Sequence, residues 1–372
     1  MKRFLTSAVV MLSVLSVSGA YAADVIEKSV VGNPELKSIN VISFAPEGVL
    51  LIGDGAAAQI VAIETEDTSP AKALPKKLPT IQKLIAGHIG AKADGIEILD
   101  LAVNPASGRA YIAIRKQDDK SYIIVTVDGS GEVREFELDN VKYARVQLSA
   151  GKVKVSRITD VAWGDDRVIA AGRSNETFSS KIFSIDAPLE HEAKGNSFSA
   201  ETYHVSHGKW ETKAPMSVVI PFKENGKTYV VGAYSCTPIV KYPIDSLKPG
   251  AQVKGESVLE LGSGNTAIDM FIYTKDGKPY VLANTFRFHH ARKPFGPSPY
   301  WTVKFEQGIL AEDANVNEKA LRRLKGYEPA TERVAMVEAY HGVRQMDKLG
   351  DSNALVMREG SDGLSLEVLV LP

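Results

Sequence analysis

Leu99-Asp100-Leu101 and Thr159-Asp160-Val161 open the same pattern: a short apolar strand, a tight polar turn, a second apolar strand, a polar loop and a third strand. Four more stretches open it, namely Ile39-Asn40-Val41, Met216-Ser217-Val218, Ile268-Asp269-Met270 and Arg344-Gln345-Met346. Their central positions follow one another at intervals of 60, 60, 57, 52 and 76 residues. Radial repetition of small sheets leaves few exposed edges, so such repeats are typical of propellers. We therefore predict an all-β, six-bladed β-propeller, with seven blades as the alternative.

The first turn of each repeat is short and rich in residues that tolerate left-handed backbone angles, as in Glu224-Asn225-Gly226 and Asp276-Gly277. The long segments lie instead in the second loops and in the connections between blades, at residues 66–97, 187–214 and 306–343. In a propeller these loops open on the face opposite to the first turns. Because binding residues concentrate on elaborated loops, we expect the function on that face.

The end of the sixth repeat suggests how the ring closes. The chain stops at Pro372 after about three strands of this repeat, whereas Asp24 to Val31 reads as an additional strand before the first repeat. We predict that this N-terminal strand completes the last blade. Thr80 to His88 and Asn317 to Lys325 have helical patterns, and we expect short helical caps over the mouth of one domain spanning residues 23–372.

The first 22 residues have the pattern of a signal peptide. Lys2 and Arg3 precede an apolar run from Phe4 to Val17, and Ala20-Tyr21-Ala22 supplies the small residues of a cleavage site. A retained anchor is the alternative, but the run is short for a membrane span, which needs ~20 residues, and none follows. We expect a periplasmic or secreted protein without a transmembrane segment after cleavage.

Composition argues against several functional classes. The chain has 44 Lys and Arg residues against 45 Asp and Glu residues, so its net charge does not favour nucleic acid. Cys236 is the only cysteine, so no intramolecular disulfide can form. We find no phosphate-binding Walker loop, dinucleotide fingerprint or nucleophile elbow.

The repeats place short polar residues around the expected channel. Asn40, Asp100, Asp160 and Asp269 occupy matched positions near the start of their innermost strands, together with Ser217 and Gln345. Carboxylate and amide oxygens around one axis suit a hard cation such as Ca²⁺. Alternatively, each aspartate bonds neighbouring backbone groups.

A second candidate metal site lies in the connection into the fourth repeat. His204, His207 and Glu211 stand close together, Gly208 permits a bend, and Cys236 falls in the second loop of the same repeat. Such a set would suit Zn or Cu. The alternative is hydrogen-bonded loop histidines with an inert, buried cysteine.

Basic residues on the elaborated face are candidate ligand contacts. Arg115, Arg173 and Arg358 occupy matched second-loop positions and could hold a carboxylate or phosphate, or could instead neutralise the aspartates. The fifth repeat adds a loop with Arg287, His289 and His290 among aromatic residues. This loop could clasp an aromatic or anionic ligand, or be pinned by its own aromatic residues.

Several stretches resemble an uncharacterised family of exported bacterial β-propeller proteins. They are Asp100 to Pro105, Ile158 to Asp160, Ser174 to Glu176, His204 to Gly208 with Glu211-Thr212, Ala233 to Pro238 and Leu247 to Gly250. The resemblance fades after Gly264. The architecture and channel aspartates are also similar, more loosely, to six-bladed lactonases that use a central calcium. Two functions follow: a module that binds a metal ion, small molecule or periplasmic protein, or a metal-dependent lactone or ester hydrolase.

Overall fold

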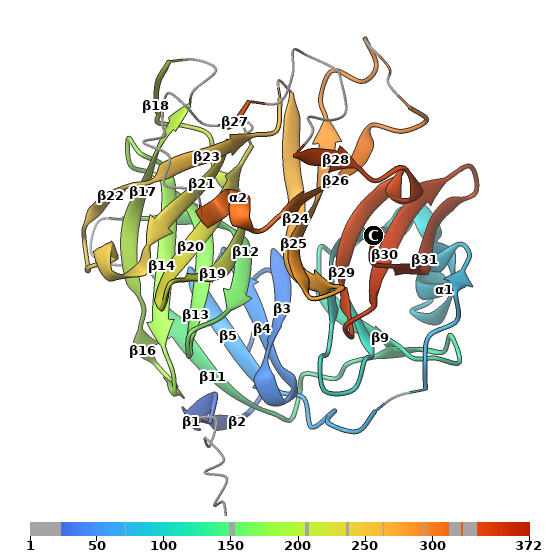
Figure 1. Ribbon diagram of the computed structural model, residues 1–372. Coiled ribbons are helices and arrows are strands. Elements are labelled where there is room, and N and C mark those ends of the chain that lie inside the picture. Colours follow the sequence, from blue (N-terminus) through green and yellow to red (C-terminus); the bar gives the residue numbers. More distant parts are fainter. Residues whose placement is uncertain are drawn as a thin grey trace, which may run out of the picture.

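The computed structural model describes residues 24–70, 72–148, 153–204, 208–235, 238–262, 264–292, 294, 296–311, 321–322 and 333–372. Apart from a small two-stranded sheet, its strands form six sheets arranged side by side around a common axis, and these six are the blades of a β-propeller (Figure 1). The predicted six-bladed architecture is therefore confirmed. We number the blades by the chain order of their innermost strands.

Each blade is described from its innermost strand outward. Blade 1 contains β3 (Val41–Ala45), β4 (Val49–Asp54), β5 (Gln59–Glu64), β11 (Val141–Gln147) and β16 (Ala193–Lys194), with β2 (Val30–Gly32) also on β11. Blade 2 contains β7 (Ile96–Val103), β8 (Ala110–Lys116), β9 (Tyr122–Val127) and β10 (Val133–Glu135). Blade 3 contains β12 (Val155–Trp163), β13 (Arg167–Ser174), β14 (Ser180–Asp186) and β17 (Asn196–His204), with β18 (Lys209–Glu211) and β22 (Gln252–Lys254) on β17.

The other three blades follow the same plan. Blade 4 contains β19 (Met216–Glu224), β20 (Lys227–Tyr234), β21 (Pro238–Pro243), β23 (Glu256–Glu260) and β27 (Leu321–Arg322). Blade 5 contains β24 (Asn265–Lys275), β25 (Lys278–Arg287), β26 (Tyr300–Glu306) and β28 (Val334–Met336). Blade 6 contains β29 (Val343–Leu349), β30 (Asn353–Gly360), β31 (Gly363–Val370) and β6 (Lys77–Leu78).

The hairpins between first and second strands form as their sequences predict. Asn225 and Gly226 have φ of 48° and 75°, and Asp276 and Gly277 have φ of 50° and 74°. Positive φ at both central residues matches the twist of the flanking strands. Asparagine, aspartate and glycine adopt these angles most readily, so local chemistry determines where each blade turns on this plain face.

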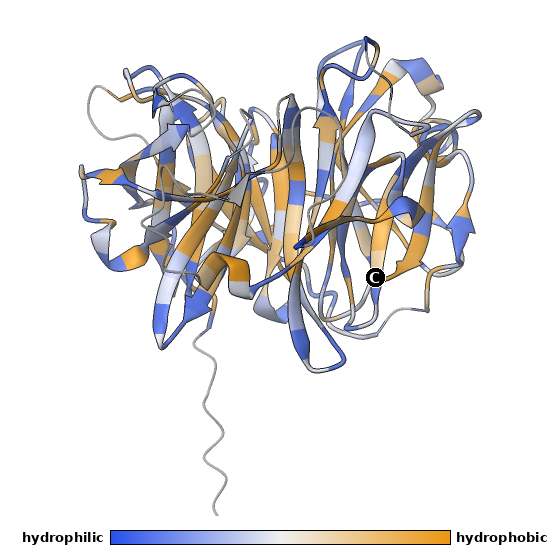
Figure 2. Cartoon of the chain, turned by 45° about the horizontal axis from the view of Figure 1, so that its top comes forward, coloured by the Kyte–Doolittle hydropathy of each residue, from blue (hydrophilic) through white to orange (hydrophobic). Residues whose placement is uncertain are grey.

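The apolar core is divided among the gaps between blades. Central strands such as β4 and β8 are buried on both faces, and each of the six core clusters lies between two neighbouring sheets. Figure 2 shows apolar residues gathered along the strands and polar residues at turns and loops. Every blade therefore depends on two neighbours to bury its sheet.

The order of blades around the ring differs from their order in the chain. The innermost strands are neighbours in the order β7, β3, β12, β19, β24, β29 and back to β7. Blade 2 therefore lies between blades 6 and 1. After β10 the chain returns across blade 1, where β11 pairs with β5, and only then enters blade 3.

The predicted closure by the N-terminal strand is wrong. β1 (Ile26–Lys28) pairs with β15 (Leu189–Glu190), and β2 pairs with β11 on blade 1. The outer strand of blade 6 is instead β6, where Leu78 pairs with Leu366. Because blade 2 is the neighbour of blade 6, the connection from blade 1 to blade 2 passes the edge of β31 and can supply this strand.

The helices lie between blades and do not line the channel. α1 (Ile81–His88) confirms the predicted helix, and its buried Ile81 and Ile85 pack into the cluster between blades 2 and 6 beside β31 (Figure 1). α2 (Gly308–Ala311) packs between blades 4 and 5. Of the second predicted helix, Asn317 to Lys325, only β27 falls within the described residues, and it is a strand.

The remaining helical segments of the described residues are single 3₁₀ turns. They are η1 (Pro46–Gly48), η2 (Ala93–Gly95), η3 (Ile244–Ser246) and η4 (Glu338–Tyr340). No helix among the described residues is long and apolar enough to cross a membrane.

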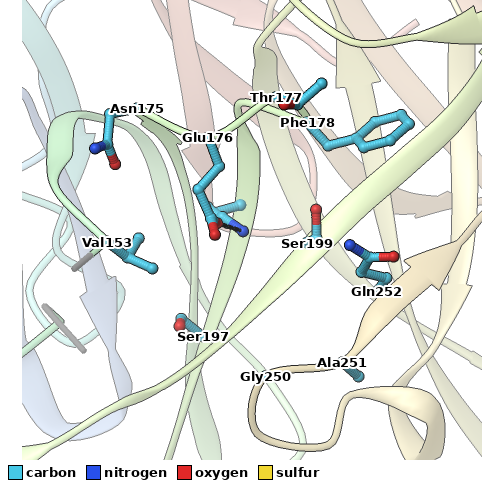
Figure 3. Close-up of a pocket in the computed structure, with 11 residues that line it drawn as sticks. Val153, Asn175, Glu176, Thr177, Phe178, Ser197, Ser199, Gly250, Ala251 and Gln252 are labelled. Carbon is cyan, nitrogen blue, oxygen red and sulfur yellow. Dashed lines mark ion pairs between the residues drawn. The ribbon is translucent and has the colours of Figure 1, made fainter. Parts of the chain in front are cut away.

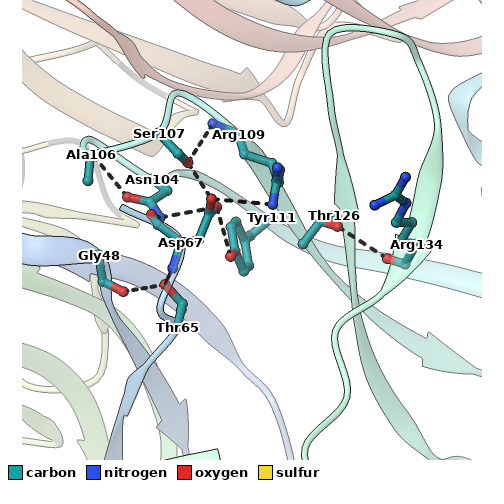
Figure 4. Close-up of polar contacts among 10 residues, drawn as sticks. All are labelled: Gly48, Thr65, Asp67, Asn104, Ala106, Ser107, Arg109, Tyr111, Thr126 and Arg134. Carbon is teal, nitrogen blue, oxygen red and sulfur yellow. Dashed lines mark hydrogen bonds and ion pairs between the residues drawn. The ribbon is translucent and has the colours of Figure 1, made fainter. Parts of the chain in front are cut away.

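A buried polar network fastens blade 1 to blade 2 (Figure 4). Asp67, three residues after β5, accepts hydrogen bonds from Ser107 Oγ at 2.8 Å and Tyr111 OH at 3.1 Å. The backbone oxygen of Asp67 accepts one from Asn104 Nδ2 at 2.7 Å, and Arg109 Nη1 lies 3.3 Å from Asp67 Oδ1. The Asp67 carboxylate thus fixes the start of the connection from blade 1 to blade 2, the two blades whose order around the ring is reversed.

We expect Asp67→Ala to lower the free energy of unfolding by about 2 to 3 kcal/mol, because it leaves the buried hydroxyl groups of Ser107 and Tyr111 without their acceptor. Urea denaturation followed by circular dichroism measures the change. The control Asp351→Ala removes a carboxylate that is 98% exposed and should change stability by less than about 0.5 kcal/mol. Equal stabilities of the two variants would contradict the role of the network.

Candidate functional site

Two cavities meet back to back along the propeller axis. The loop-face cavity, of about 330 Å³, lies at the starts of the innermost strands. The plain-face cavity, of about 210 Å³, lies at their ends and has Phe44, Trp163 and Phe271 in its wall. Asp100, Asp160 and Asp269 line both cavities. The matched aspartates therefore form the boundary between the two halves of the channel, as their repeat positions predict.

Each of these aspartates joins its blade to the next one around the ring. Asp100 Oδ2 accepts the N–H of Ile42 in β3 at 2.7 Å, and Asp160 Oδ2 accepts that of Val219 in β19 at 2.6 Å. Asp269 Oδ2 accepts that of Met346 in β29 at 2.8 Å. These three N–H groups have no partner within their own sheets, so the aspartate oxygens serve as their hydrogen-bond acceptors. The interpretation of the aspartates as partners of neighbouring backbone groups is thus confirmed for all three.

The other matched positions depart from the simple repeat. Asn40 Oδ1 accepts from Ile158 N at 3.2 Å, which joins blade 1 to blade 3. In β19 the residue that follows the β-bulge is Val218, so Ser217 lies one position off the aspartates, although it lines the loop-face cavity. Sequence reasoning missed Asp347, whose Oδ2 accepts from Val103 N at 2.7 Å and joins blade 6 to blade 2. An acidic residue two positions after Gln345 was the available signal.

Burial raises the pKa of the channel carboxyl groups. Loss of water raises the pKa of Asp100 to about 7 and that of Asp347 to about 6, despite the hydrogen bonds from backbone N–H groups. The pKa values of Asp160 and Asp269 rise well above the ordinary range, through burial and through repulsion from the charge of Asp100. The aspartates consequently hold protons at a pH where exposed carboxyl groups are ionised.

The geometry of the described residues lends the two metal-site hypotheses no support. Within the described ranges, no three His, Cys, Asp or Glu side chains gather closely enough to hold a metal ion. His204 is buried in β17 with Nε2 3.6 Å from Glu260 Oε2, and Glu211 Oε1 accepts from Lys213 N at 2.8 Å. His207 and Cys236 lie outside the described residues.

Most of the predicted ligand-binding residues have structural contacts. Arg115 Nη2 lies 2.6 Å from Glu97 Oε2, on blade 2. Arg358 binds Glu367 and donates to the backbone oxygens of His341 and Ala339, which holds the connection into blade 6. Both therefore stabilise their own blade.

The predicted loop of blade 5, which contains Arg287, His289 and His290, is held by buried contacts at its start. Arg287 is buried, with its guanidinium 3.7 Å from the centre of the Trp301 ring. His289 is half-buried against Gly264. Burial, and then the charge of Arg287, lowers the pKa of His290, which favours its neutral form. The contact of Arg287 with the Trp301 ring thus supports the interpretation of a loop pinned by its own aromatic residues.

Arg173 alone among the predicted arginines has no ion pair or ring contact with a residue that the structure describes. It is exposed and stands directly opposite Arg157 in the β12–β13 ladder, and Arg157 lines the loop-face cavity. Neither guanidinium forms an ion pair with any residue that the structure describes. The alignment of the repeats did not include Arg157, because this residue precedes the matched positions. A basic residue at the start of an innermost strand could have indicated it.

Arg344 is a third exposed guanidinium near this mouth. It lines a smaller cavity of about 190 Å³, which shares Leu99, Ile268 and Gln345 with the loop-face cavity. Its guanidinium carbon lies 5.5 Å from the centre of the Tyr300 ring. The mouth therefore carries cationic groups on two sides, above a floor of buried carboxyl groups.

Comparison with known proteins gives a likeness of architecture only. No protein-family model and no curated protein matches the chain. Among solved structures, a bifunctional GH43-CE protein of Bacteroides eggerthii is 12% identical, with 75% of this chain and 33% of that chain covered and a TM-score of 0.36. An α-L-arabinofuranosidase from Lactobacillus brevis is 11% identical, with 77% and 95% covered and a TM-score of 0.36.

A protein of unknown function from Bacteroides caccae is 12% identical, with 82% and 84% covered and a TM-score of 0.33. This chain spans about a third of the length of the first of the three proteins. At these identities and scores the likenesses carry no information on ligand or activity. The resemblance to exported bacterial propellers stays a prediction.

The raised carboxyl pKa values predict that stability falls as the pH rises. Unfolded aspartate loses its proton near pH 3.9, whereas native Asp100 keeps it to about pH 7, so the native state binds more protons between these values. The free energy of unfolding should decrease through this window, by roughly 4 kcal/mol for Asp100 alone. Urea denaturation at intervals from pH 4 to pH 8 measures the slope.

Asp100→Asn tests the source of this slope. The amide cannot ionise and can still offer one oxygen to a backbone N–H, so we expect a shallower pH dependence than in the wild type. Asp94→Asn, in the exposed turn η2, removes a carboxyl group equally and serves as the control. A slope as steep in Asp100→Asn as in both the control and the wild type would assign the effect to other groups.

Proposed function

We propose that the protein is an exported binding protein that holds a small oxyanion ligand, a carboxylate or a phosphate, at the loop-face mouth of its channel. The observation that carries this proposal is the directly opposed pair of Arg157 and Arg173 beside the loop-face cavity. The metal-dependent hydrolase stays a prediction; within the described ranges no three His, Cys, Asp or Glu side chains gather to hold its cation.

The arginine pair is unfavourable without a counter-ion. Like charges directly opposite each other in an antiparallel ladder repel, and neither guanidinium group forms an ion pair with a carboxylate of the described residues. An oxyanion between them removes the repulsion and accepts paired N–H bonds, which guanidinium groups form best with planar carboxylates and with phosphates. Relief of the repulsion between the two guanidinium groups would thus favour binding.

The rest of the mouth supports a small, polar ligand. The loop-face cavity falls within the ~300–1,000 Å³ of small-molecule pockets, and Asn40, Thr159, Ser217 and Gln345 supply neutral polar groups to its wall. The buried carboxyl groups of Asp100, Asp160 and Asp269 at the floor offer an anion no positive charge. We therefore place the charged end of the ligand at the arginines and its neutral part over the floor.

Binding of succinate, citrate and glycerol phosphate by the mature protein tests this proposal by isothermal titration calorimetry. We expect at least one of them to bind. Arg157→Gln and Arg173→Gln should each weaken binding about tenfold or more, since a hydrogen bond to a charged group contributes about 1.5–3 kcal/mol. Affinity should also fall as salt is added, because both guanidinium groups are exposed.

Arg134→Gln is the matched control. It removes one exposed arginine on the outermost strand of blade 2, where Arg134 is paired with Glu132, and should leave the affinity unchanged. No binding to the wild type, or equal binding by all three variants, would refute the proposal. Selective binding of glycerol phosphate or of the carboxylates decides between the two oxyanion classes.

A further inference from the structure

A second cavity lies on the outer part of blade 3, away from the channel. This flank cavity has a volume of about 400 Å³ and is bounded by β14, by β17, by the start of β22 and by the loop of residues 174–179 (Figure 3). None of its lining residues lines the loop-face cavity. We infer that it is a separate binding site for a neutral, polyhydroxylated molecule of the monosaccharide class.

Polar side chains form a row along the floor of the flank cavity. Lys181 in β14 stands opposite Ser199 in β17, and Ser199 stands beside Gln252 in β22. Residues in register on adjacent strands point to the same face of a sheet. An ammonium group, a hydroxyl and an amide are therefore presented side by side, and Ser197, two residues before Ser199, adds a second hydroxyl.

The opposite wall is a loop with a fixed conformation. Asn175 N donates to Lys154 O at 3.1 Å, and Lys154 N donates back to Asn175 Oδ1 at 2.9 Å. Ser179 N donates to Thr212 O at 3.1 Å. Both ends of the loop are thus held before any ligand arrives, which reduces the ordering that binding requires. The loop contributes Glu176 and the half-buried ring of Phe178 to the cavity.

The charge balance of the flank cavity selects an uncharged ligand. Lys181 is only 6% exposed, and a buried ammonium group requires a counter-charge. Glu176 supplies it through a close ion pair. With this pair in place the described lining of the flank cavity has no net charge to offer an anion or a cation, whereas the arginines of the channel mouth have no counter-charge among the described residues.

The same ion pair suits hydroxyl groups. A hydroxyl donates one hydrogen bond and accepts others, so it can donate to Glu176 while it accepts from Lys181. Bonds with an ionised partner are the stronger ones. Ser199 and Gln252 continue this alternation of donors and acceptors, and the Phe178 ring offers an apolar surface to the C–H face of a sugar. A polyhydroxylated ring satisfies all of these groups together.

The test is titration of the mature protein with glucose, galactose, arabinose and mannitol, followed by saturation-transfer NMR and calorimetry. We expect saturable binding of at least one of them in the wild type. Gln252→Ala and Ser199→Ala should each weaken it about fivefold or more, because each removes a hydrogen bond worth about 1 kcal/mol. The control Gln117→Ala replaces a half-buried glutamine on blade 2 and should bind as the wild type does. Absence of binding in the wild type, or unchanged affinity in both cavity variants, overturns the inference.

A change of selectivity separates a ligand site from a merely structural ion pair. In Glu176→Gln the ammonium group of Lys181 lacks its counter-charge, so galacturonate should gain about tenfold over galactose relative to the wild type. Glu176→Asp, which keeps the charge, should retain the preference for galactose. An unchanged ratio in Glu176→Gln, with the fold intact by circular dichroism, counts against the site. Because neither sugar contacts Arg157 or Arg173 under this inference, its failure leaves the anion proposal untouched.

Discussion

The structure depends on one constraint: every blade has an apolar sheet that is buried on both faces, so each sheet requires a neighbour on either side. The six core clusters lie in the six gaps between adjacent blades. An open row of blades would expose the apolar face of a sheet at both ends, whereas in a closed ring every sheet face has a neighbour. Burial of apolar surface therefore stabilises the closed ring more than the hydrogen bonds of the outermost strand do. For this reason the two-residue strand β6 is enough to complete blade 6.

The reversal of blades 1 and 2 follows from how that ring is closed. The connection after β5 runs to the side of blade 6, contributes β6 and α1 on the way, and enters blade 2 between blades 6 and 1. The chain then crosses blade 1 as β11. Residues far apart in sequence, such as Glu64 and Lys142, thereby become neighbours in one sheet. Two separate connections hold the first blade in place, and the Asp67 network fixes the first of them.

The channel aspartates stabilise the ring at a cost to their own ionisation. As acceptors of backbone N–H groups from the next blade they bind the ring together, but burial makes their charged forms unfavourable. Such groups need no ligand to explain their position. The cationic groups at the mouth and the ion pair of the flank cavity lie outside this framework, and for that reason they are better candidates for ligand contacts than the aspartates are.

The sequence by itself determined the strands, the first turns, the number of blades and the matched position of Asp100, Asp160 and Asp269. These features depend on periodicity and on turn residues within a few positions, such as Asn225-Gly226. Only the tertiary structure decided the blade order, the closing strand, and the pairing of β22 with β17, which brings Gln252 to the flank cavity. The physical reason is that similar blades have similar edges, so local sequence does not specify which edges meet. Which edges meet is decided by the long connections and by packing between blades that are distant in the chain.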